Sequence, residues 1–198
     1  EISKVLYRVN AGGPAIVSID NERDWDADTA AENSPYLTDA GNNNTGGYSM
    51  DSFTSEIDQM STPESIFSSE RSDNVAGAPN ITYSFPIETA GNYEVRIYMG
   101  NGYHNTSSEG QRIFDIEIEG LVYQEMDDID LSGRFGHKVG AVISKIVEVN
   151  DGTLNISLLH GAVENPLING IEILSASGGG IPIEITQIPD QVNFAGEI

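Results

Sequence analysis

The sequence predicts an all-β fold, a two-sheet antiparallel β-sandwich of the jelly-roll type. Short segments that alternate apolar and polar residues recur along the chain, whereas apolar residues at helical spacing are hard to find. Gly, Asn and Asp residues separate these segments, as turns separate the short strands of a sandwich. The 198 residues are enough for one substantial sandwich and a fragment of another domain.

The N-terminal third combines one clear strand with a long irregular stretch. Residues 4–10 (KVLYRVN) alternate and stop at residues 11–14 (AGGP), a strong strand breaker. We expect residues 15–20 to form a short second strand. Residues 21–65 are rich in Asp, Asn, Ser, Thr and Gly. Because loops of this length in a compact domain are usually functional or disordered, this stretch is a candidate binding-loop region.

The next segments predict three strands. Residues 65–69, 80–87 (NITYSFPI) and 91–99 (GNYEVRIYM) have the β pattern. Residues 88–91 (ETAG) have the composition of a tight turn, so we expect the strands on either side of it to pair as a hairpin.

Residues 112–119 (RIFDIEIE) show the cleanest alternation in the chain. Successive side chains of a strand point to opposite faces, so one face of this segment is predicted to be apolar. That face consists of Phe114, Ile116 and Ile118. Gly120 then predicts a second hairpin, which leads into residues 121–125.

The last strands of the domain flank the sharpest turn signal in the sequence. Residues 139–149 and 153–159 lie on either side of Asn150–Asp151–Gly152, a favoured turn sequence. Residues 167–174 are expected to close the domain. Together with the preceding segments they supply enough short strands for two sheets.

Composition at the C-terminus predicts a change of domain. Residues 1–175 form the predicted sandwich, and residues 176–180 are a Gly/Ser-type flexible linker. Residues 181–198 (IPIEITQIPDQVNFAGEI) resume a strand pattern but cannot bury a core alone. We interpret them as the start of a truncated immunoglobulin- or cadherin-like repeat, so the partners of the sandwich include neighbouring domains of the same chain.

The charge balance argues against two classes of partner. Thirty-one acidic and nine basic residues give a formal net charge of −22, which repels nucleic acid and anionic membrane surfaces. No apolar run approaches the ~20 residues that cross a bilayer. The absence of cysteine excludes disulfides, thiolate nucleophiles and cysteine-bound zinc. We expect a secreted or cell-surface module, monomeric and from a bacterium in a saline environment.

Six blocks of sequence resemble malectin and the malectin-like carbohydrate-binding modules of bacterial surface proteins and enzymes. In order along the chain they are residues 7–15 (YRVNAGGPA), 25–28 (WDAD), 66–71 (IFSSER), 110–116 (GQRIFDI), 128–130 (DID) and 164–173 (ENPLINGIEI). The resemblance spans residues 4 to 174. It implies a galactose-binding-like sandwich that holds an oligosaccharide or polysaccharide through loops at one end, without catalysis.

By position, the resemblance implies a carbohydrate site made from separate loops. Its predicted members are Tyr48, Arg71, Tyr103, His104, Glu164 and Asn165. Aromatic rings cover the apolar face of a sugar, a carboxylate accepts hydrogen bonds from hydroxyl groups, and Arg and Asn donate them. The chain departs from the family at Ser72, where an aromatic residue is common, and at His104, which replaces the second aromatic of a pair.

Other interpretations remain open for these residues and for the module. Arg71 is also expected as a structural salt-bridge partner, and Trp25 as a core residue. A glycoside hydrolase would need a defined carboxylate pair, and the chain has no recognisable nucleophile motif. The alternative to a lectin is a structural or adhesive spacer of a large extracellular protein, with a degenerate sugar site.

No cofactor is required by this prediction, but calcium is a possible structural ion. Residues 20–22, 24–28 and 127–130 contain closely spaced acidic oxygens of the kind that Ca²⁺ prefers. None of these clusters has the twelve-residue EF-hand spacing. The histidines at 104, 137 and 160 are scattered, without the spacing of a zinc site.

Overall fold

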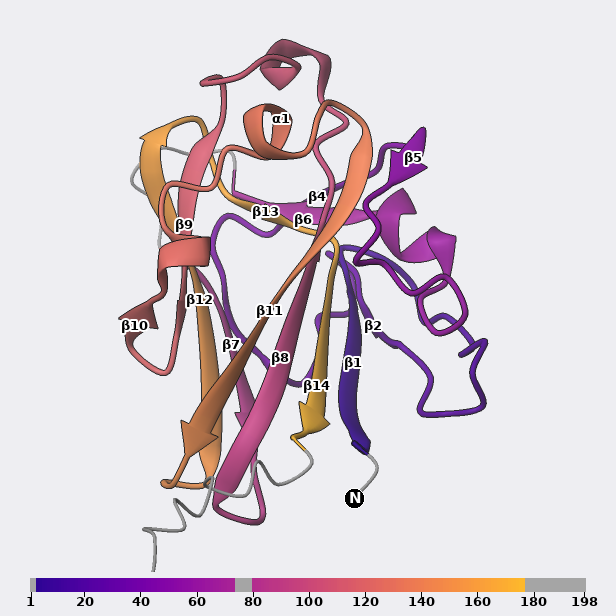
Figure 1. The fold of residues 1–198 in the computed structure, drawn as a ribbon, viewed down its shortest axis with the longest axis vertical. Coiled ribbons are helices and arrows are strands. Elements are labelled where there is room, and N and C mark those ends of the chain that lie inside the picture. The colour runs from indigo at the N-terminus through magenta and orange to yellow at the C-terminus, as the bar shows by residue number, and fades with distance from the viewer. Residues whose placement is uncertain (1–2, 74–79, 177–198) are drawn as a thin grey trace, which may run out of the picture.

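A computed structural model describes residues 3–73 and 80–176 and confirms the predicted two-sheet β-sandwich (Figure 1). The six-stranded sheet has the order β2 (Asp26–Asp28), β1 (Val5–Ala11), β14 (Gly170–Ser175), β8 (Gly91–Met99), β11 (Val139–Val149) and β5 (Ser52–Phe53). The five-stranded sheet has the order β10 (Leu121–Val122), β9 (Ile113–Ile118), β12 (Thr153–Val163), β7 (Ile81–Pro86) and β3 (Leu37–Ala40).

A third, smaller sheet lies at one end of the sandwich, the upper end in Figure 1. Its three strands are β13 (Leu167–Ile168), β6 (Glu70–Ser72) and β4 (Asn44–Gly46). The helical elements of the described residues are short: η1 (Glu64–Ser68), η2 (His104–Thr106), η3 (Gln124–Met126) and α1 (Leu131–Arg134). In the part of the chain that the structure describes, no helix is long and apolar enough to cross a bilayer.

The main core lies between the two large sheets, because their strands alternate as the sequence predicts. Phe114, Ile116 and Ile118 on β9 are all fully buried, whereas the residues between them are partly exposed. They meet side chains of the opposite sheet such as Ile97 and Ile143. Burial of this apolar surface is the main favourable term for the fold.

The predicted hairpin between residues 80–87 and 91–99 is wrong. β7 pairs with β12 and β3 in the five-stranded sheet, whereas β8 pairs with β11 and β14 in the six-stranded sheet. The turn after Asn150 crosses between the sheets in the same way, and the Ile87 N–H donates to the Gly152 carbonyl at 2.8 Å. Consecutive strands β7 and β8, and likewise β11 and β12, lie in opposite sheets. Each strand can then turn its apolar face toward the core that the two sheets enclose.

The predicted hairpin at Gly120 is confirmed. Leu121 pairs with Ile118, and β10 continues antiparallel to β9. Glu119 and Gly120 both have positive φ, 53° and 74°. Two consecutive positive φ values are the geometry of a type I′ turn, whose twist matches that of the flanking strands.

Two further local predictions differ from the structure. Residues 65–69 belong mostly to η1, not to a strand, because a short apolar run does not by itself distinguish the two. Its buried side chains are Ile66 and Phe67. Residues 15–20 make only an isolated bridge from Ile16 to Trp25, and Val17 is 75% exposed. Residues 21–65 contain β2 to β5 as short strands within irregular chain.

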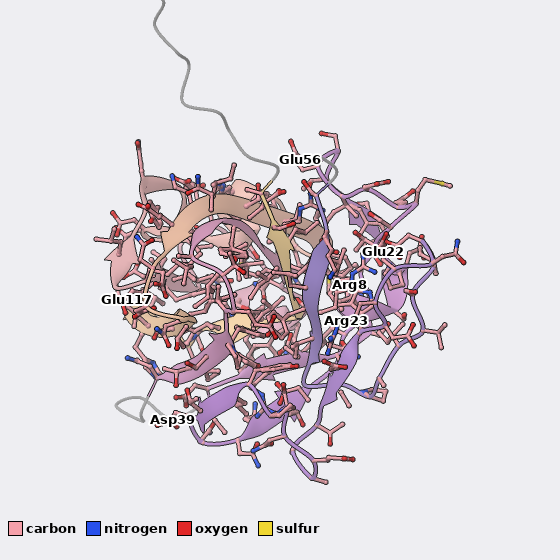
Figure 2. The ribbon with its side chains drawn as sticks, turned by 90° about the horizontal axis from the view of Figure 1, so that it is seen from below. Arg8, Glu22, Arg23, Asp39, Glu56 and Glu117 are labelled. Atoms are coloured by element: carbon pink, nitrogen blue, oxygen red, sulfur yellow. The ribbon has the colours of Figure 1, made fainter. Side chains whose placement is uncertain are left out.

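A second core covers the outer face of the six-stranded sheet. Trp25 is fully buried there, as predicted, with Phe67 and Tyr98 around it. The guanidinium of Arg8 lies 5.2 Å from the centroid of the Trp25 ring and forms ion pairs with Glu172 and Asp20. Seen from below, Arg8 stands beside β1 on the side of the segment that carries Glu22 and Arg23 (Figure 2).

Acidic side chains project from several separate segments of the chain. In Figure 2 the labelled side chains Glu22, Asp39, Glu56 and Glu117 lie on different sides of the outline. Spreading like charges lowers their mutual repulsion. The predicted linker, apart from Ala176, and the predicted following repeat lie outside the described residues.

Candidate functional site

A cavity of about 390 Å³ opens at the end of the sandwich that carries the three-stranded sheet. Loops from four parts of the chain meet there. Its lining comprises Asn44, Thr45, Gly46, Tyr48, Glu70, Ser72, Asp73, Tyr103, Arg112, Glu164 and Asn165. The cavity therefore lies where the sequence resemblance places a sugar site, on loops at one end of the fold.

Four of the six predicted site residues line this cavity. Tyr48 and Tyr103 come from different loops, and their ring centroids lie 6.3 Å apart with a 48° angle between the planes. Glu164 and Asn165 are neighbours, and the Asn165 amide donates to the Glu164 carboxylate at 3.1 Å. The structure thus brings together rings, a carboxylate and an amide; their role in binding stays a prediction.

The position of Tyr48 depends on a glycine in the opposing loop. A Cβ at Gly102 would lie 2.1 Å from the Tyr48 Cβ and 2.6 Å from its Cγ. Real contacts of this kind need more than 3 Å, so only glycine allows the two loops to approach this closely. Burial raises the pKa of Tyr48, which keeps its hydroxyl protonated.

Arg71 does not line the cavity. Its side chain is fully buried, and it donates to both carboxylate oxygens of Asp28, from Nε at 2.8 Å and from Nη2 at 2.9 Å. Tyr83 donates to the same carboxylate at 2.7 Å. The geometry agrees with the structural interpretation of Arg71, as an ion-pair partner for a neighbouring strand.

His104 also lies outside the lining. It is exposed at the start of η2. Its ring and the Tyr103 ring form an edge contact, with 5.0 Å between the centroids and 67° between the planes. His104 therefore contacts a cavity residue without facing the cavity. The neighbouring Asn105 amide donates to the Tyr103 hydroxyl at 2.6 Å and helps to hold that ring.

The sequence interpretation missed three charged residues in the lining, Glu70, Asp73 and Arg112, although Glu70 and Arg112 belong to blocks quoted for the resemblance. Strand alternation on β6 explains the placement of the first, because Glu70 and Ser72 line the cavity while Arg71 between them does not. That alternation is a sequence signal that could have identified Glu70. Arg112 precedes β9, and its Nη1 donates to the Asn165 carbonyl.

Burial changes the acid–base properties of this pair. Glu70 and Arg112 are each 5% exposed. Desolvation raises the pKa of Glu70 to about 7, and the positive charge of Arg112 partly opposes the rise. Desolvation also lowers the pKa of Arg112, against the attraction of Glu70 and Glu164. The cavity therefore contains a buried carboxyl group that titrates near neutral pH.

The acidic clusters expected to bind calcium contain side chains that already have protein partners. Asp20 pairs with Arg8, Asp28 pairs with Arg71, and Asp130 accepts from the Gly133 N–H at the start of α1. Within residues 3–73 and 80–176, no group of three or more His, Cys, Asp or Glu side chains is arranged to hold a metal ion.

Comparison with protein families identifies the sandwich. The model of the malectin domain matches residues 5–171, which include both large sheets and the cavity. The chain belongs to the malectin family. The resemblance drawn from the sequence blocks is therefore confirmed at the level of the family, and the malectin domain accounts for nearly all of the described residues.

The relatives found are plant proteins. Receptor-like protein 4 of Arabidopsis thaliana is 30% identical over 116 residues, 58% of this chain and 18% of that protein. The putative receptor-like protein kinase At5g39000 of the same plant is 25% identical over 194 residues, 86% of this chain and 21% of that protein. The chain spans about a fifth of the length of these relatives. They give no support to the expected bacterial source.

Solved structures agree with the fold. The ANXUR2 extracellular domain from Arabidopsis thaliana has a TM-score of 0.73 and 19% identity, over 87% of this chain and 49% of that chain. A plant complex of the peptide RALF23 with FER and LLG2 gives a TM-score of 0.70 and 21% identity, over 87% and 48%. At these identities the likeness establishes the fold alone.

Proposed function

We propose that this malectin domain is a non-catalytic carbohydrate-binding module and that its ligand is an oligosaccharide, of glucan or another type, held in the cavity. The observation that supports this is the convergence of Tyr48, Tyr103, Glu164 and Asn165 on one hollow. The tyrosine rings offer apolar faces to the C–H side of a sugar, and the carboxylate and amide offer hydrogen bonds to its hydroxyl groups. The place of action is extracellular, as for the extracellular domains of similar fold.

The size and exposure of the cavity favour weak, reversible binding. A volume of about 390 Å³ is at the lower end of the range for small-molecule sites, so it accommodates one or two sugar rings. We expect dissociation constants from millimolar to micromolar, about −4 to −8 kcal/mol. Calorimetry with maltotriose, cellotriose and galactotriose, preceded by a glycan array, measures this directly.

A pair of Tyr103 variants tests whether the cavity is the site. Tyr103→Ala removes the ring and is expected to weaken binding at least several-fold. Tyr103→Phe keeps the ring and removes only the hydroxyl, which already accepts from Asn105, so most of the affinity remains. Equal binding by wild type and Tyr103→Ala would place the sugar elsewhere.

The second candidate is a structural or adhesive spacer domain. Ser72 favours it, because this position lines the cavity and supplies no ring to cover a sugar face. FER forms a complex with the peptide RALF23 and with LLG2. Peptides are therefore a further kind of ligand to include in the screen. No binding on the glycan array, together with a folded protein, supports the spacer.

A further inference from the structure

We propose that Glu70 and Arg112 bind adjacent hydroxyl groups of an uncharged sugar and make the cavity select neutral saccharides over uronic acids. This inference rests on the proposed function and assigns the specificity of the same cavity. Both charged groups are buried, and most of their hydrogen-bonding capacity is unused within the described residues.

Glu70 is a buried carboxyl group that lies in the field of Arg112 but has no hydrogen-bond partner among the described residues. It is 5% exposed and lines the cavity, yet its side chain makes no hydrogen bond or ion pair with any of residues 3–73 and 80–176. Polar groups of buried residues in native proteins almost always have a hydrogen-bond partner, in the protein or in bound water. A ligand hydroxyl that enters the cavity supplies the missing donor.

Arg112 is in the same condition. A guanidinium has five N–H donors, and among the described residues the Asn165 carbonyl is the single acceptor that it reaches. Its Nε is buried without a hydrogen-bond partner. Arg112 lines the cavity together with Glu70. One group accepts hydrogen bonds and the other donates them, which matches the two roles of neighbouring sugar hydroxyls.

The charge of the lining decides against an anionic sugar. Glu70, Asp73 and Glu164 line the cavity, whereas Arg112 supplies its cationic side chain. Arg112 lies in the field of Glu70 and Glu164, so much of its charge is already compensated. A uronate carboxylate would be repelled by Glu70 and Glu164 in a half-enclosed site, and the net charge of −22 opposes its approach as well.

A matched pair of trisaccharides tests this selection. Trigalacturonate and its carboxyl-reduced counterpart, α-1,4-galactotriose, differ only at C6, where the first has a carboxylate and the second an uncharged hydroxymethyl group. Calorimetric or NMR titration of the wild-type domain is expected to give at least tenfold tighter binding of galactotriose. Tighter binding of trigalacturonate would overturn the proposed selection.

Two conservative variants test the residues, with the neutral trisaccharides maltotriose, cellotriose and galactotriose as probes. Glu70→Gln keeps the shape and removes the charge, and Arg112→Lys keeps the charge and removes the planar fork. Each is expected to weaken binding at least fivefold, and Glu70→Gln to narrow the discrimination against trigalacturonate. Glu148→Gln, an exposed change on β11 outside the cavity, is the charge-matched control. It is expected to leave the affinity for the neutral trisaccharides and the discrimination against trigalacturonate unchanged.

The outcomes separate this inference from the proposed function. Neutral sugar that still binds both variants at wild-type affinity, but is lost in Tyr103→Ala, overturns the roles of Glu70 and Arg112 and leaves the site in place. A wild-type domain that binds no saccharide overturns the proposed function and this inference with it. Melting curves confirm that each variant is folded at the titration temperature.

Discussion

Arg71 and Asp28 form a bidentate ion pair in which both side chains are fully buried, Nε 2.8 Å from Oδ2 and Nη2 2.9 Å from Oδ1. The pair joins β6 of the small sheet to β2 of the six-stranded sheet. It therefore fixes the strand that presents Glu70 to the cavity.

Replacing Asp28 with Asn is expected to destabilise the domain by about 3 to 5 kcal/mol, because it leaves the Arg71 charge buried and uncompensated. Asp26→Asn, which breaks the exposed pair with Arg23, is the control and costs less than about 1 kcal/mol. Urea unfolding of both variants measures the difference. Equal losses would show that the buried pair has no special role in stability.

Glu70→Gln is expected to change how stability depends on pH. The pKa of Glu70 in the folded state, about 7, lies above its ordinary value of 4.5, so the native state binds this proton more tightly than the unfolded chain does. The contribution of this protonated carboxyl to wild-type stability is therefore lost as pH rises from about 4.5 through 7. Between pH 4 and pH 8 the stability of Glu70→Gln relative to wild type should rise by up to roughly 3 kcal/mol.

Urea unfolding across that range, with Glu148→Gln as the exposed control, reads out the effect. A difference between Glu70→Gln and wild type that stays constant with pH would mean that this carboxyl has an ordinary pKa in the folded protein.

Gly102→Ala is expected to weaken sugar binding several-fold with little change in the core. The new Cβ would lie 2.1 Å from the Tyr48 Cβ, so the loop that carries Tyr48 must move away from Tyr103. Gly91→Ala is the control, since a Cβ there has no heavy atom within 4 Å. Titration and melting temperature are compared for both variants. Unchanged affinity in Gly102→Ala would show that Tyr48 does not contact the ligand.

Calcium removal is expected to leave the melting temperature unchanged. Asp20, Asp28 and Asp130 already have hydrogen-bond or ion-pair partners in the protein, and a native-state ligand raises stability only if it binds. Scanning calorimetry in excess chelator is compared with calcium and with magnesium at equal ionic strength. A rise with calcium that magnesium does not reproduce would establish a structural calcium ion.

Local patterns were sufficient to predict the strands but not their partners. The alternation at Phe114, Ile116 and Ile118 correctly predicted a buried face. The turn composition after Ile87 correctly predicted a turn, but it contains no information about which sheet the next strand joins. That choice depends on enclosing one core between two sheets, a property of the whole chain.

The candidate site was predictable where residues project from loops and not where charges are buried. Tyr48, Tyr103, Glu164 and Asn165 were predicted by position and share one cavity. Glu70 and Arg112 were missed because charged residues are normally exposed, although the alternation of β6 around Arg71 is a sequence signal for Glu70. Arg71, between two cavity residues in sequence, faces the other way by strand alternation.

β1 and β14 are antiparallel neighbours, with Val5 opposite Leu174 and Asn10 opposite Gly170. Val5 and Leu174 lie at the same end of this strand pair. A force that pulls these two residues apart therefore breaks the hydrogen bonds between β1 and β14 one after another. If the force instead acted along the strands from opposite ends, all hydrogen bonds between them would resist it together. Under tension the domain should peel open from the end remote from the cavity, so the binding end is the last part to lose its shape.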